Sequence, residues 1–206
     1  DRAIELDPKS AIAYGNRGAT YDDLGDKKRA IADYDRAIEL DPKFVYAYRN
    51  RGLAYSDLGD KIRAIADFSR AIELDPKGAN AYYNRGLAYY ELGDKIKAIT
   101  DYSRAIELDP KDAQAYIFRG VAYAVLGDNI RAIADLDRAI ELDPKHAIAY
   151  ASRGLVYGAL GDKIRAIVDY DKAIELNPKL AQAYYNRGGP YDELGDKIRA
   201  IADLDR

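Results

Sequence analysis

The chain has 206 residues, of which 48% are hydrophobic and 33% charged, and its formal net charge is −3. This composition is typical of a globular or repeat protein and argues against disorder. Positive and negative charges are interspersed, so no nucleic-acid-binding arm and no membrane-surface patch is predicted. No apolar stretch approaches the roughly 18 residues that a transmembrane helix needs.

Cysteine is absent, which excludes disulfides and thiolate metal sites. The composition does not fix a compartment, and cytoplasmic is only the default. Because the sequence begins at Asp1 without methionine, we expect it to be a fragment of a longer chain.

A step of 34 residues runs through the whole sequence. Leu-Gly-Asp recurs at Leu24, Leu58, Leu92, Leu126, Leu160 and Leu194. A proline after Asp or Asn follows the same step, at Pro8, Pro42, Pro76, Pro110, Pro144 and Pro178. A shared period of this length indicates an array of structural repeats.

In chain order, residues 1–10 are a partial repeat that begins inside a second helix. Full repeats are predicted at 11–44, 45–78, 79–112, 113–146 and 147–180, and an incomplete last repeat at 181–206. The last repeat reads Gly188-Gly189-Pro190, and a proline inside a helix costs about 3 kcal/mol or more. We therefore expect its first helix to kink or fray near Gly189.

Each full repeat reads as two amphipathic helices. In Ala79–Asp112, apolar or small residues recur at helical spacing in both halves. Gly93 between the halves can take the left-handed conformation that closes the first helix, and Asp94 can cap the second. The second helix should end before Pro110. A unit of this size is stabilised by stacking on its neighbours.

The repeat closely resembles the tetratricopeptide repeat. Counting from Ala79 as position 1, the family's signature residues stand at Tyr82, Gly86, Tyr89, Ala98, Tyr102, Ala105 and Pro110. The resemblance covers the entire chain, although position 7 holds arginine where the family often has leucine. It implies an all-α, right-handed superhelical solenoid whose concave groove binds extended or helical peptides.

Function should lie where the repeats differ. Helical geometry places positions 2, 6, 9 and 13 of each first helix on one stripe, flanked by 5 and 12. Fifteen of the 19 tyrosines occupy positions 4, 11 and 24, which we interpret as core. The other four, Tyr46, Tyr83, Tyr90 and Tyr185, all lie on the stripe. Tyrosine is enriched at recognition surfaces, so we favour binding over a role in packing against neighbouring repeats.

Position 6 carries asparagine in four repeats, at Asn16, Asn50, Asn84 and Asn186. An amide both donates and accepts, so such a ladder can bind a partner's backbone, as in peptide-binding members of the family. An equally weighted alternative is that asparagine is simply the consensus residue at this position and is hydrated. The family's clamp for a C-terminal carboxylate is not predicted, because position 2 lacks the lysines and Asn84 stands where the clamp has arginine.

The stripe changes character along the chain. Position 13 is acidic in the first three repeats and apolar at Val125 and Ala159. A patch of Ile117, Phe118, Val121, Ala124 and Val125 is unusually apolar, and such patches often mark partner sites. We expect a partner segment with apolar side chains there and basic groups facing the acidic end.

Catalysis and metal binding are not predicted. His146, the only histidine, has no second His or Cys to pair with and is interpreted as a solvated loop residue. The carboxylates recur at helix caps and exposed faces, and no phosphate loop or nucleophile motif is present. We expect no cofactor. The position-7 arginines should pack between helices and pair with carboxylates such as Asp33 and Asp67.

The sequence therefore predicts a non-enzymatic scaffold that binds a protein or peptide partner, with no nucleic-acid or membrane partner. The predicted groove residues are Asn16, Tyr46, Arg49, Asn50, Asn80, Tyr83, Asn84, Tyr90, Gln114, Phe118 and Asn186. The alternative is a structural scaffold that self-associates end to end, since half-helices at Asp1–Leu6 and at the Arg206 end could complete each other. An arbitrary fragment boundary would explain the same ends.

Overall fold

The computed structural model describes residues 2–204 of the chain. Within this range all regular structure is α-helical, and no strand occurs. The helices are α1 (Arg2–Leu6), α2 (Ala11–Asp23), α3 (Lys27–Leu40), α4 (Val45–Asp57), α5 (Lys61–Leu74), α6 (Ala79–Glu91), α7 (Lys95–Leu108), α8 (Ala113–Val125), α9 (Asn129–Leu142), α10 (Ala147–Ala159), α11 (Lys163–Leu176), α12 (Ala181–Glu193) and α13 (Lys197–Leu204).

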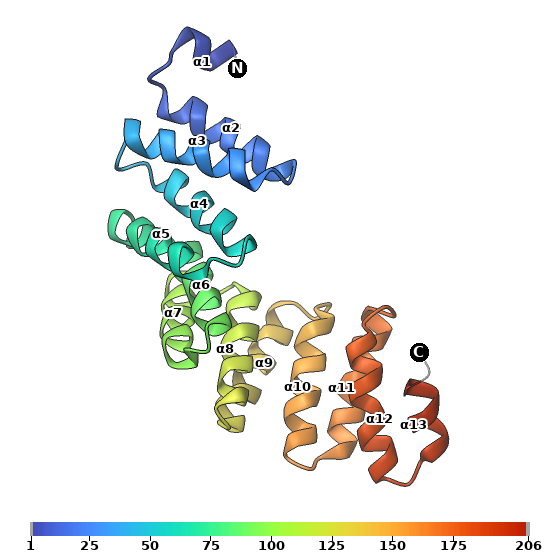
Figure 1. Ribbon diagram of the computed structural model, residues 1–206. Helices are drawn as coiled ribbons and strands as arrows, with labels where there is room; N and C mark the ends of the chain where they lie inside the picture. The colour runs from blue at the N-terminus through green and yellow to red at the C-terminus, as the bar shows by residue number, and fades with distance from the viewer. Residues whose placement is uncertain (1, 205–206) are drawn as a thin grey trace. The chain divides into compact units, whose positions relative to one another are not determined.

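The helices form two compact units, divided between Asp109 and Pro110. In each unit the first helix of a repeat, here the A helix, packs against the second, the B helix (Figure 1). Each B helix then packs on the A helix of the following repeat of the same unit. The A helices are α2, α4 and α6 in the first unit and α8, α10 and α12 in the second. This consecutive packing confirms the predicted all-α fold of stacked helical hairpins.

A glycine and a capping aspartate form every turn from an A helix to its B helix. Gly93 has a φ of +91°, in the left-handed region that glycine enters without steric cost. The Asp94 carboxylate accepts a hydrogen bond from the backbone N–H of Lys97 at 3.1 Å, which satisfies one of the free amides at the start of α7. Positive φ recurs at Gly25, Gly59, Gly127, Gly161 and Gly195. The predicted turn chemistry is confirmed.

The core of each hairpin lies where a large B-helix side chain meets a glycine of the A helix. A Cβ on Gly86 would lie 2.9 Å from the Tyr102 ring and 3.3 Å from the Ala98 carbonyl oxygen. Ala98 and Tyr102 are fully buried. The glycine at position 8 therefore lets the two helices approach closely, and the aromatic ring fills the space.

The position-7 arginines pair with carboxylates, as predicted. Arg51 donates to both Asp67 oxygens at 2.8 and 2.6 Å, and to Asp35 of the preceding repeat at 2.6 Å. Its guanidinium also lies 5.7 and 5.9 Å from the ring centres of Tyr48 and Tyr55. Tyr48 is only half-buried. The tyrosines at positions 4 and 11 thus surround an arginine. Tyr55, Tyr157, Tyr184 and Tyr191 are buried in the core, as predicted, whereas the other tyrosines at these positions are half-buried at its edge.

The first helix of the last repeat is continuous, and the expectation that it frays was wrong. Helix α12 runs through Pro190 to Glu193. Gly189 has no Cβ to clash with the following proline ring, and no atom from another part of the fold lies within 4 Å of where one would stand. Beyond the proline, Tyr191 is buried, so tertiary packing holds the final turn. At the chain ends, Asp1 and Arg206 of the end-to-end hypothesis lie outside the described residues.

Candidate functional site

On α4, three of the predicted residues form one cluster. The Tyr46 ring packs on Phe44 with ring centres 5.6 Å apart, and the Arg49 guanidinium lies 5.7 Å from the Tyr46 ring centre. Asn50 stands one turn after Tyr46, on the same helix face. All three are half-buried. Arg49 supplies a cation beside aromatic surface, an arrangement suited to a partner with acidic or aromatic groups.

On α6, the next A helix of the first unit, Asn80 is exposed and Asn84 is half-buried one turn later. The Tyr83 ring lies 5.9 Å from the buried Tyr102 ring, with the two planes tilted by 49°. Tyr83 therefore packs against the core and also leaves part of its ring accessible to a partner.

Two predicted residues stand further along the stripe of the first unit. Asn16 on α2 is exposed. The Tyr90 ring, near the end of α6, lies 3.4 Å from the Lys95 ammonium group, which also donates to the Tyr90 carbonyl. A cation already covers this ring in part, so Tyr90 offers less surface to a partner than the sequence suggested.

In the second unit, Gln114 is exposed on α8, and its amide nitrogen lies 2.6 Å from His146 Nε2. His146 is half-buried rather than fully solvated, and it stands at the N-cap position of α10 without a side-chain capping hydrogen bond. Phe118 is also half-buried. The Asn186 side-chain oxygen accepts a hydrogen bond from Gln182 at 2.7 Å, so part of its amide is already used.

A lysine at the start of a B helix bridges to an acidic residue at the end of the next A helix. These inter-repeat pairs, here the lysine bridges, are Lys27 with Asp57 (Nζ–Oδ2 2.5 Å), Lys61 with Glu91, and Lys163 with Glu193 (2.6 Å). The side chains are partly exposed, so each bridge is worth only about 0–1 kcal/mol. Their more direct effect is to place long charged side chains across the surface between adjacent A helices.

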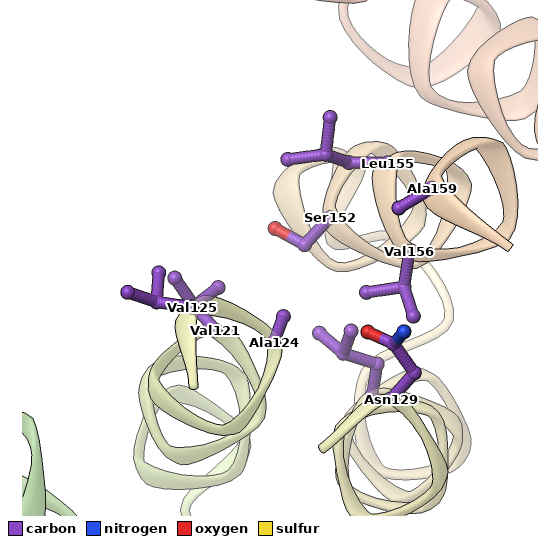
Figure 2. A pocket seen from close by; sticks show the side chains of 9 residues that line it. Val121, Ala124, Val125, Asn129, Ser152, Leu155, Val156 and Ala159 are labelled. Carbon is purple, nitrogen blue, oxygen red and sulfur yellow. The ribbon is translucent and has the colours of Figure 1, made fainter. Parts of the chain in front are cut away.

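Between α8 and α10 both members of this bridge are replaced. Asn129 stands where the other B helices of the second unit begin with lysine, and Ala159 stands where α12 has Glu193. An open apolar cavity of about 290 Å³ occupies this place (Figure 2). Its lining residues are Val121, Ala124, Val125, Asn129, Leu136, Ser152, Leu155, Val156 and Ala159.

The cavity has a buried floor and an exposed apolar rim. Leu136 and Val156 are 0% and 2% exposed, whereas Val125 and Leu155 are 57% and 55% exposed on the two helices that flank the opening. Asn129 and Val156 point toward one another at its base (Figure 2). Exposed apolar side chains that are contiguous, as around this opening, often mark a binding surface.

The structure corrects the apolar patch that the sequence indicated. Ile117 is only 2% exposed and belongs to the core, because it packs in one cluster with Leu136 of α9 and Val156 of α10. Val121, Ala124 and Val125 do line the cavity. Sequence analysis missed Asn129 and Leu155. Asn129 could have been found from the sequence. It replaces the lysine found at this position in the other repeats, and Ala159 in the following repeat replaces the acidic residue that this lysine would face.

The described part of the chain holds no group of three or more His, Asp or Glu side chains that could ligate a metal. Within residues 2–204 no helix is long and apolar enough to cross a membrane.

The sequence matches the family model described as tetratricopeptide repeat at residues 11–44, 45–77, 79–112 and 147–180. A second model, described as TPR repeat, matches residues 63–93 and 120–161. The chain belongs to the tetratricopeptide repeat family. It is thus one of a class of interaction scaffolds that bind protein or peptide partners and are generally not enzymes. No curated protein sequence matches the chain.

Solved structures of tetratricopeptide proteins are similar to this chain. YrrB, described as a TPR protein with an unusual peptide-binding site, is 28% identical, with a TM-score of 0.74 over 88% of this chain and 94% of its own. MamA is 31% identical, with a TM-score of 0.74 over 84% and 94% of the two chains. PilW, a type IV pilus biogenesis factor, shares the fold at 21% identity, with a TM-score of 0.85 over 94% and 90%.

Proposed function

We propose that this tetratricopeptide repeat chain binds an extended or helical segment of a partner protein along the stripe of its A helices. One observation carries the proposal. On the adjacent helices α4 and α6, tyrosine rings and uncharged amides occupy the stripe, whereas the exposed faces of the B helices carry pairs such as Arg70 with Glu73. Amides and phenol groups can bind peptide backbone whatever its side chains. The peptide-binding site of YrrB supports the same use of the fold.

A random-peptide display library tests this proposal. The bait is the intact chain, and the variant Asn50→Ala/Tyr83→Ala/Asn84→Ala removes two amides and one ring from the stripe. The matched control, Arg70→Ala/Glu73→Ala/Lys77→Ala, makes three substitutions of exposed residues away from it. All three proteins are first checked for equal helicity by circular dichroism.

We expect the intact chain and the control to retain the same family of peptides and the stripe variant to lose it. If all three proteins retain the same peptides, or if selection enriches no peptide, the stripe is not a peptide-binding surface and the proposal fails.

A further inference from the structure

The cavity between α8 and α10 lies at a junction without a lysine bridge, and both members of the bridge are replaced there. The other junctions between adjacent A helices of one unit, two in the first unit and one in the second, each carry a lysine and an acid that bridge them. At this junction the lysine is Asn129 and the acid is Ala159. Retaining only one partner would leave a charged side chain beside the opening. Losing both keeps the junction neutral and leaves its apolar floor open.

The size and lining of the cavity define what it can accept. At about 290 Å³ it is at the lower limit of small-molecule sites, which suits one large side chain rather than a cofactor. Its floor and rim are formed by Leu136, Val156, Val125 and Leu155, so a bound group would contact mainly aliphatic carbon. The lining includes no ionisable side chain, so a charged group entering it would lose water without gaining a counter-ion.

The polar atoms of the lining are few and uncharged. The Ser152 hydroxyl and the Asn129 amide stand on α10 and α9, and both can donate and accept hydrogen bonds. They are suited to the backbone N–H and C=O of a segment whose side chain enters the cavity. The nearest lysine bridge of the same unit, Lys163 with Glu193, is already paired and offers little to a charged partner group.

We infer that this cavity is a selectivity pocket for a leucine or isoleucine side chain of the partner segment, and that it excludes lysine, arginine, aspartate and glutamate. The inference rests on the proposed function and specifies which chemistry the second unit recognises. The occupant is a partner peptide with an aliphatic residue at one fixed position.

The same random-peptide display library tests the pocket through variants that close it in two ways. Asn129→Lys/Ala159→Glu restores the charged bridge across the opening, and Ala159→Leu fills the opening without adding charge. The control Lys172→Glu/Glu175→Lys reverses an exposed ion pair on α11, so composition and net charge stay constant and the pocket and the stripe are untouched. Helicity and unfolding midpoint are compared for all variants before binding is measured.

We expect peptides selected by the intact chain to share leucine or isoleucine at one position. Their affinity should fall about tenfold for both closed variants, the scale expected for one buried aliphatic side chain, and stay within about twofold for the control. A shared charged residue, or unchanged affinity for both closed variants, would overturn the pocket while leaving stripe binding intact. Enrichment of no peptide by the intact chain would overturn both proposals.

Discussion

At the position of Gly86 the fold depends on the absence of a methyl group. A Cβ there would approach the buried Tyr102 ring to 2.9 Å. Gly158, one turn later in the equivalent helix of another repeat, has open surroundings, and its nearest neighbour would be Ala166 Cβ at 4.0 Å. Packing therefore requires glycine at position 86, whereas Gly158 only lowers the stability of its helix.

Gly86→Ala should lower the free energy of unfolding by about 1–3 kcal/mol, because the ring or the helix must move. Gly158→Ala should raise it by up to about 1 kcal/mol, because alanine favours helix. Urea unfolding followed by circular dichroism measures both. Equal stability of Gly86→Ala and the parent would contradict the packing described for position 8.

The capping aspartates make the stability of the chain depend on pH. The backbone N–H of Arg63 and its side chain both donate to Asp60, which lowers the pKa of this carboxyl below its usual 3.8. The pKa is lowered in the same way at the caps Asp26, Asp94, Asp128, Asp162 and Asp196. A carboxyl with a lower pKa when folded stabilises the fold above its unfolded pKa and loses this effect as pH falls through the folded value.

Stability should therefore be constant from neutral pH down to about pH 4 and fall below it. A variant with serine at all six caps keeps a capping oxygen that does not titrate, so its loss of stability on acidification should be smaller. Urea midpoints at pH 7 and pH 3 provide the comparison. Identical losses in the two proteins would show that the caps do not cause the pH dependence.

At the scale of the element, α12 shows tertiary packing overriding a local preference. Proline inside a helix removes one hydrogen bond, yet α12 continues to Glu193. Pro190→Ala should restore that bond and stabilise the chain by about 1–3 kcal/mol. Pro178→Ala, in the turn before the same helix, serves as the control and should give no gain. An unchanged unfolding midpoint in Pro190→Ala would show that the proline does not weaken α12.

Neighbouring hairpins are joined by arginines whose second partner varies. Arg51 and Arg153 each reach back to an aspartate of the preceding repeat, Asp35 and Asp137, whereas Arg85 reaches Ser69 at 3.1 Å. Ser69→Asp should give Arg85 the same second carboxylate and raise the unfolding free energy by up to about 1 kcal/mol. Asp137→Ser should lower it by a similar amount. A destabilised Ser69→Asp variant would contradict this interpretation.

These elements show why the fold was predictable from sequence. Identical turns, caps and core glycines recur every 34 residues, so each local signal was read six times. The continuous helix through Pro190 was not predictable, because it depends on the burial of Tyr191. The stripe could be placed by helical periodicity, but the burial of Ile117 and the cavity beside Asn129 depend on how hairpins stack.

For the whole molecule, the central claim is that partner recognition resides on the A helices, and that the B helices support them. The alternating order of A and B helices gives both units the same division. The A helices carry aromatic and amide groups in one unit and supply most of the cavity lining in the other. A partner segment should therefore contact A helices in either unit.

Chemical-shift mapping of a peptide selected by display tests this claim most directly, using the full chain labelled with ¹⁵N. Peptide addition should shift backbone amides on α4, α6, α8 or α10, including those near Asn50, Asn84 or Ser152. It should leave unchanged the exposed faces of α5 and α7 and the part of α9 that does not line the cavity. If the largest shifts instead fall on the B helices, the site lies on the opposite surface and the account of recognition is wrong.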